Sequence, residues 1–176
     1  LNPPYKSVLN YLQDHDLSVI SIGKIYDIFN GQGITKKISS GTNKEGIDKI
    51  LDIMDKKFTG LFFAKLNYFD CLYCHSRDVN GYADAIEALD VEIPLMLNKH
   101  NPDYLLIITA DHGNDPTFKG TDHTREYVPV IVYSSVFKEP KQLDKLPSLA
   151  DVGATIAENF NVEKPAIGNS FLNKLK

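Results

Sequence analysis

The sequence has no apolar run long enough to cross a membrane and no block of like charges. None of its apolar segments approaches the roughly 18 consecutive residues that a transmembrane helix requires. Its 19 basic and 23 acidic side chains are interspersed, with a formal net charge of -4, which argues against a nucleic-acid surface. The opening residues "LNPPYKSVLN" lack the charged-then-apolar order of a signal peptide. We therefore expect a cytoplasmic protein that binds neither membranes nor nucleic acid.

Cysteine is also scarce. Cys71 and Cys74 are too few for a disulfide framework, and thiols stay reduced in the cytosol. Together with His75 they complete CxxCH, the attachment pattern of c-type haem. Haem attachment requires an oxidising compartment and usually a second axial ligand, whereas Met54 and Met96 both fit helix cores. The sequence therefore predicts no haem, and it favours inert buried thiols over a redox or structural zinc role, which lacks a second cysteine pair.

What the sequence does contain is the composition of a globular domain. Its 176 residues, 43% hydrophobic and 24% charged, are enough for one sizeable core. Segments with helical spacing of apolar residues alternate with apolar runs that are too continuous for half-exposed strands. This alternation predicts an α/β fold with a largely parallel sheet flanked by helices. The expected strands are 17–23, 60–68, 103–110 and 128–134; the expected helices are a short one around 8–12, 43–55, 78–98 with Pro94 kinking or ending it, and 148–160.

Aspartate and histidine side chains gather at the ends of the expected strands. Asp70 and His75 follow the strand 60–68. Asp111 and His112 follow the strand 103–110, and His123 lies in the loop before the next strand. Ligands of parallel α/β sheets bind beyond the carboxyl ends of the strands. Each of these residues alone is more often a cap or a solvated side chain, but five together favour a metal centre.

The types of ligand indicate which metal ions suit this centre. Carboxylate and imidazole donors without an obligatory thiolate suit Mn²⁺ or Zn²⁺. Asp111 and His112 are adjacent, so their side chains diverge in extended backbone, but a tight turn at Gly113 would let both bind one ion. The other three side chains are enough for a second ion. Two ions about 3.5–4 Å apart stabilise the attacking and leaving oxygens of a phosphoryl displacement.

Several segments carry a resemblance to a known family. The segment "ITADHGNDPTFKGTDHTREYVPVIVY" resembles the metal-binding segment of phosphopentomutases, which belong to the alkaline phosphatase superfamily. The segments "FDCLYCHSRDVNGYADAIEALD", "ISIGKIYDIFNGQGIT" and "DVGATIAENF" are similar to the same family in the right order and separation, so the resemblance spans nearly the whole chain. Its most specific part is ADHGxDPTxxGTDHTRE, because ADHGN alone also occurs in the related cofactor-independent phosphoglycerate mutases.

The resemblance implies an activity, its cofactors and the roles of the five ligands. The parent enzyme would be an isomerase, an intramolecular phosphotransferase that interconverts (deoxy)ribose 1-phosphate and (deoxy)ribose 5-phosphate through a phosphoenzyme and a sugar bisphosphate. Asp111 and His112 would bind one manganese ion, and Asp70, His75 and His123 the other; zinc or another divalent ion could replace manganese. A pentose phosphate is the implied substrate, and a sugar bisphosphate is the implied activator. The family is not expected to need thiols at the two cysteine positions.

The resemblance also implies that residues 1–176 are the carboxy-terminal part of an alkaline-phosphatase-like metal-binding core. The family's Ser or Thr nucleophile and a further metal-binding Asp would lie in a missing amino-terminal half, together with the cap domain. We therefore expect no catalytic nucleophile in this chain and no activity of this chain alone. The threonines near the motif fit ordinary strand, loop and turn positions better than a nucleophile: Thr109, Thr117, Thr121 and Thr124.

Two cations are candidates for contacts with substrate phosphate. Lys24 follows the first expected strand, and a solvated loop lysine is an equal alternative. Arg125 could touch phosphate, order the His123 loop, or form a structural ion pair. Two other functions stay open from the sequence. One is another enzyme of the alkaline phosphatase superfamily, such as a cofactor-independent phosphoglycerate mutase or a phosphohydrolase; the other is a non-catalytic metal-binding domain.

Overall fold

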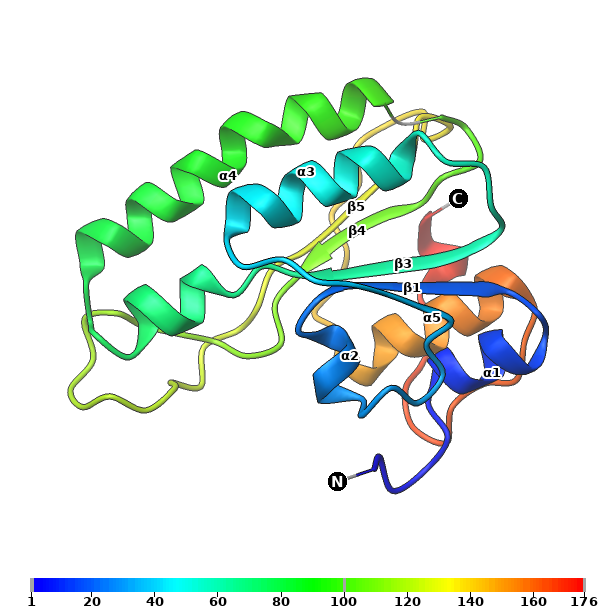
Figure 1. The fold of residues 1–176 in the computed structure, drawn as a ribbon, viewed down its shortest axis with the longest axis horizontal. Helices are drawn as coiled ribbons and strands as arrows, with labels where there is room; N and C mark the ends of the chain where they lie inside the picture. Colours follow the sequence, from blue (N-terminus) through cyan, green and yellow to red (C-terminus); the bar gives the residue numbers. More distant parts are fainter. Residues whose placement is uncertain (1, 100, 176) are drawn as a thin grey trace. The chain divides into compact units, whose positions relative to one another are not determined.

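A computed structural model describes residues 2–99 and 101–175 (Figure 1). The chain divides into two compact units. Unit 1 comprises Leu1–Ser40, Lys56–Lys65 and Phe137–Lys176, and unit 2 comprises Gly41–Asp55 and Leu66–Val136. Among the described residues, no helix combines the length and the apolar character needed to span a bilayer.

Unit 1 is built on a three-stranded parallel sheet with the order β2-β1-β3. The strands are β1 (Ser18–Gly23), β2 (Lys36–Ile38) and β3 (Gly60–Lys65). In the central strand, Ile20 is paired with Lys36 on one side and Phe62 on the other. All residues of β1 after Ser18 are buried, as the continuous apolar run predicted.

The helices of unit 1 bury their apolar residues beside this sheet. α1 (Val8–Asp14) and α5 (Ala150–Phe160) pack against each other, and α1 also packs on β1 (Figure 1). Two shorter helices complete the unit, α2 (Ile25–Ile28) and the 3-10 helix η2 (Leu172–Leu175). The core cluster consists of Val8, Leu9, Leu12, Val19, Ile25, Ile34 and Ala157.

A buried polar cluster fastens the carboxy-terminal segment of unit 1 to α5. The Asp151 carboxylate, only 1% exposed as a residue, accepts hydrogen bonds from the backbone amides of Ser148 at 3.3 Å and Asn169 at 2.8 Å. The Thr155 hydroxyl donates to the Asp151 carbonyl at 2.7 Å and accepts from the Phe171 amide at 3.0 Å. These bonds compensate for burying polar groups in the interior.

Unit 2 contains helices and a two-stranded antiparallel sheet. Its elements are α3 (Asn43–Met54), the π-helix η1 (Phe69–Cys74), α4 (Val79–Lys99), β4 (Leu106–Thr109) and β5 (Val130–Tyr133). α3 packs against α4. The β4–β5 pair aligns Leu106 with Tyr133 and Thr109 with Val130. Neither strand of this pair has a fully buried residue.

The predicted α/β fold, with a parallel sheet flanked by helices, is confirmed. The antiparallel pairing of β4 with β5 was not predicted, because apolar runs alone do not reveal strand direction. Pro94 lies inside α4, which continues to Lys99, so the proline does not end the helix. β2 was missed because its sequence, KKI, has two exposed lysines and no apolar run.

Candidate metal centre

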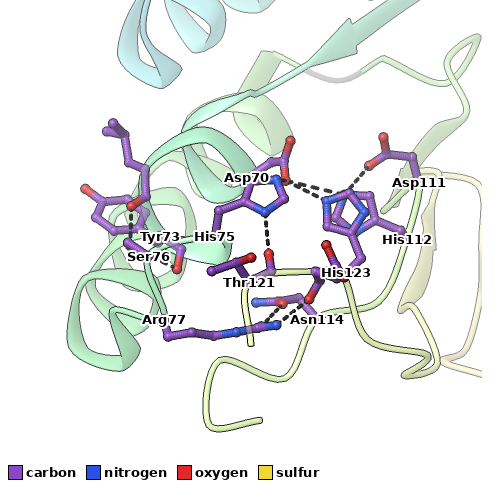
Figure 2. Close-up of polar contacts among 12 residues, drawn as sticks. Asp70, Tyr73, His75, Ser76, Arg77, Asp111, His112, Asn114, Thr121 and His123 are labelled. Atoms are coloured by element: carbon purple, nitrogen blue, oxygen red, sulfur yellow. Dashed lines mark hydrogen bonds and ion pairs between the residues drawn. The ribbon is translucent and has the colours of Figure 1, made fainter. Parts of the chain in front are cut away.

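All five predicted metal ligands lie in unit 2, on three segments of the chain (Figure 2). Asp70 is on η1, and His75 directly follows that π-helix. Asp111 and His112 follow β4, and His123 lies in the loop that leads to β5. Short π-helices occur frequently at functional sites. The fold thus brings together residues that are distant in the sequence: Asp70 and His123, which are 53 residues apart, are in hydrogen-bonding contact.

Three imidazoles converge on the carboxylate of Asp70. Its Oδ1 lies 3.1 Å from Nε2 of His123, 3.4 Å from Nε2 of His75 and 3.7 Å from Nε2 of His112. The rings of His112 and His123 stack with centroids 3.7 Å apart and planes 14° apart. Oδ1 of Asp111 lies 3.9 Å from Nε2 of His112. The predicted ligands therefore form one continuous polar cluster.

This donor set fits a divalent metal ion. One donor atom from each of Asp70, His112 and His123 lies within 4.8 Å of the other two, and the same holds for Cys74, His75 and His123. Carboxylate and imidazole are common ligands of Zn²⁺ and Mn²⁺. His112 shares the first group with Asp70 and His123, whereas the family resemblance pairs it with Asp111. Which residues bind which ion stays a prediction.

Backbone carbonyls orient two of the imidazoles. Nδ1 of His75 shares a 2.6 Å hydrogen bond with the Thr121 carbonyl, and Nδ1 of His112 shares a 3.0 Å hydrogen bond with the Gly113 carbonyl. A hydrogen bond at one ring nitrogen fixes the tautomer and the ring direction that a metal-binding histidine needs. In both rings it leaves Nε2 on the side of Asp70.

Arg77 holds the loop that leads to His123, a role that sequence reasoning missed. Its Nη1 donates to Asn114 Oδ1 at 2.9 Å (Figure 2). The same Nη1 donates to the Asp115 carbonyl at 3.0 Å, and Nε donates to the Gly120 carbonyl at 2.6 Å. Its Nη2 donates to the Asp122 carbonyl. One guanidinium thus ties the segment after η1 to both ends of the loop. An arginine two residues after a predicted ligand offers no sequence signal for these bonds.

The two predicted phosphate contacts are both exposed. Lys24 lies in unit 1, at the start of α2. Arg125 lies in unit 2, two residues after His123, and Arg77 donates hydrogen bonds that order the preceding loop. Substrate contacts by Lys24 and Arg125 stay predictions.

A turn at Asp115 shapes the same loop. Its carboxylate accepts hydrogen bonds from the backbone amide of Thr117 at 2.8 Å and from the Thr117 hydroxyl at 2.6 Å. These two bonds hold the pKa of Asp115 below its usual range, because they stabilise the charged form. The Asp115 amide donates to the Thr124 hydroxyl at 2.6 Å. The hydroxyls of Thr117 and Thr124 therefore stabilise the loop, as their sequence positions predicted.

The position of Gly113 leaves no room for a side chain. The sequence suggested that Gly113 would permit a tight turn, but Gly113 is not among the residues with positive φ. It forms an isolated antiparallel bridge with Thr124, and a Cβ atom at Gly113 would overlap the backbone carbonyl of Glu126. Close approach of two backbone segments thus explains the glycine.

The two cysteines have different environments. Cys71 is exposed, whereas Cys74 is 1% exposed as a residue. Burial raises the pKa of the Cys74 thiol, and the neighbouring Asp70 carboxylate raises it further. The prediction of a buried thiol therefore holds for Cys74 and is wrong for Cys71.

Comparison with known proteins identifies the family. The chain matches the sequence model of the Metalloenzyme superfamily over residues 8–164. It belongs to this superfamily.

Among solved structures it is similar to phosphoglycerate mutase from Leishmania mexicana, whose crystal structures were determined at low cobalt concentration. The TM-score is 0.71 at 18% sequence identity, and the match covers 92% of this chain and 38% of the mutase chain. That identity establishes a shared fold, and the chain spans well under half the length of the mutase. Membership of the superfamily and the donor cluster together indicate a divalent metal centre.

Proposed function

We propose that this chain is the carboxy-terminal part of the metal-binding core of a phosphopentomutase. The observation that carries the proposal is the cluster of Asp70, His75, Asp111, His112 and His123, because the most specific family motif supplies three of these five residues. The parent enzyme would be a cytoplasmic isomerase that moves a phosphoryl group between the two ends of ribose or deoxyribose. The mutase fold of the Leishmania mexicana enzyme supports this class of reaction.

The residues of this chain would hold and orient the metal centre. Asp111 and His112 would bind one Mn²⁺ ion, and Asp70, His75 and His123 the other. When bound, such ions lower the pKa of a hydroxyl nucleophile and neutralise charge on the transferring phosphoryl group.

Residues around the ligands would keep this geometry fixed. Hydrogen bonds to the backbone carbonyls of Thr121 and Gly113 would fix the ring orientations of His75 and His112, respectively. Arg77 holds the loop before His123. In the proposal, Lys24 and Arg125 bind substrate phosphate, and a sugar bisphosphate activates the enzyme by supplying the phosphoryl group of the phosphoenzyme.

The nucleophile, a further metal-binding Asp and the cap domain would belong to an amino-terminal half of the same protein. The match to only 38% of the mutase chain is consistent with a longer parent protein.

A substrate assay tests the proposal. The full-length protein with Mn²⁺ should interconvert ribose 1-phosphate and ribose 5-phosphate, and Asp70→Asn should remove most of this activity. The 176-residue chain alone should show no turnover. Robust turnover by the isolated chain would mean that its nucleophile lies within these residues, contrary to the proposal.

The same assay separates the alternatives. The main alternative is a cofactor-independent phosphoglycerate mutase, which the ADHGN segment and the fold shared with the Leishmania mexicana enzyme support. It would convert phosphoglycerates and leave pentose phosphates unchanged, and a phosphohydrolase would release inorganic phosphate. A non-catalytic domain would bind metal without turnover even as the full-length protein.

A further inference from the structure

Cys74 lies among the predicted metal ligands although the family motif assigns it no role. Its Sγ, a ring nitrogen of His75 and a ring nitrogen of His123 all lie within 4.8 Å of one another. Two of these three residues are predicted ligands. We propose that Cys74 is a thiolate ligand of this centre and shifts its preference from manganese towards zinc. The inference rests on the metal centre of the proposed function and specifies one of its ligands.

The π-helix explains why Cys74 can reach the centre. In a π-helix the hydrogen bonds join residues five apart, so side chains four and five positions apart lie on the same face. Asp70, Cys74 and His75 have this spacing on η1 and just after it. Cys71, three residues before Cys74 on the same element, is exposed and belongs to neither donor group. The two cysteines therefore provide a matched pair for experiments.

The donor chemistry determines which ion is favoured. Thiolate and imidazole ligands suit Zn²⁺, whereas Mn²⁺ prefers carboxylate, carbonyl and water oxygens. The carboxylate of Asp70, whose Oδ1 lies 3.1 Å from His123 Nε2 and 3.4 Å from His75 Nε2, can supply a fourth donor. On binding, the Cys74 thiol loses its proton to solvent and the sulfur forms the bond to the metal. No oxidant or reductant is involved.

Cobalt absorption tests the sulfur ligand directly. Titration of the 176-residue chain with Co²⁺ should produce a thiolate-to-cobalt charge-transfer band in the near ultraviolet. Cys74→Ser should abolish this band, while Cys71→Ser should retain it. Calorimetry should show a loss of Zn²⁺ affinity of at least about tenfold in Cys74→Ser, since even partners of metal ligands contribute about 10–100-fold. The affinity for Mn²⁺ should change much less.

The outcomes separate this inference from the proposed function. Visible cobalt bands without the charge-transfer band in the unmodified chain would exclude Cys74 as a ligand and leave the histidine and carboxylate centre intact. Loss of the band in Cys71→Ser but not in Cys74→Ser would also overturn the inference. Absence of any Co²⁺, Zn²⁺ or Mn²⁺ binding would contradict both proposals. The measurement on the unmodified chain is decisive even if Cys74→Ser does not fold.

Discussion

Unit 1 and unit 2 are stabilised by different kinds of interaction. In unit 1, Leu12 and Val19 are 0% exposed, and the central strand is almost entirely buried. In unit 2, the strands β4 and β5 are only partly buried, and the buried apolar residues belong mainly to α3. The loop of unit 2 is held by Arg77 and by the turn at Asp115. Apolar burial thus dominates one unit, and polar contacts shape the functional part of the other.

The difference has an energetic reason. Full burial of a large aliphatic side chain contributes about 1.5–3 kcal/mol, without any requirement for direction. A metal centre needs partly hydrated carboxylates and imidazoles in fixed positions, and removing them from water without partners costs free energy. A ligand that binds only the folded chain stabilises it by mass action. We therefore expect unit 2, and not unit 1, to contain the residues whose protection from hydrogen exchange rises when metal is added.

The largest expected effect is on the core of unit 1. Leu12→Ala should lower the free energy of unfolding by about 2–5 kcal/mol, because it leaves a cavity where the side chain is fully buried. The control is Val91→Ala on α4, whose side chain is largely exposed, and it should change stability by less than about 0.5 kcal/mol. Urea unfolding of the metal-free chain measures both. Similar losses in the two variants would contradict the stabilisation of unit 1 by apolar burial.

The next largest effect is expected on the metal affinity of unit 2. His123→Ala should weaken binding of Mn²⁺ or Zn²⁺ by at least about tenfold, because His123 belongs to both donor groups. His15→Ala is the control, since His15 pairs with Glu163 at 2.7 Å in unit 1 and should leave metal affinity unchanged. Calorimetric titration at a pH where imidazole is neutral measures the affinities.

His112→Ala distinguishes the two possible groupings of ligands. If His112 pairs with Asp111, as the family resemblance implies, its loss should change metal binding little, because that site has only two ligands in this chain. If His112 shares an ion with Asp70 and His123, as their proximity suggests, its loss should approach that of His123→Ala. Equal losses would therefore refute the grouping that the resemblance implies.

Sequence reasoning predicted the elements with strong apolar patterns. The buried strand β1 follows from its continuous apolar run. The helices α3, α4 and α5 follow from helical spacing of apolar residues, such as Ile47, Ile50 and Met54 in α3. Elements without such a pattern were missed. β2 has two lysines and forms by pairing with β1, and the π-helix η1 depends on a backbone geometry that side-chain spacing does not encode.

In the candidate site too, residues with a clear sequence signal were predicted and residues without one were missed. Its five candidate ligands were singled out by their residue types and their positions after strands, and the structure places them in one polar cluster. That they bind metal stays a prediction. Arg77 was not found, because its contacts depend on the path of the loop. A zinc role for the cysteines was considered but not favoured, because the sequence does not show that Cys74 lies beside His75 and His123. Gly113 was noticed as a residue that permits a turn, but its close approach to Glu126 was not predicted, because that approach exists only in the folded chain.

A smaller effect is expected for the arginine that holds the loop. Arg77→Lys keeps the charge but loses the planar fork that donates to carbonyls on both sides of the loop. We expect faster hydrogen exchange in residues 114–122 and a stability loss of about 1.5–3 kcal/mol, the contribution of one hydrogen bond to a charged group. Lys99→Arg is a control on α4, where the lysine pairs with Asp55 at 2.5 Å. Unchanged exchange in the loop would show that Arg77 does not order it.

The smallest expected effect concerns the turn at Asp115. Because hydrogen bonds from Thr117 lower the pKa of this carboxyl group, they favour the folded chain above the usual carboxyl pKa. That contribution is lost as the pH falls through the lowered pKa. Thr117→Val removes the hydroxyl donor and keeps the amide donor, so the pKa of Asp115 should rise towards its usual range, whereas Thr117→Ser should leave it low. NMR titration of the carboxyl carbon measures this shift. An equally low pKa of Asp115 in Thr117→Val would mean that the Thr117 amide alone stabilises the charged carboxylate and that the hydroxyl is not needed for the turn.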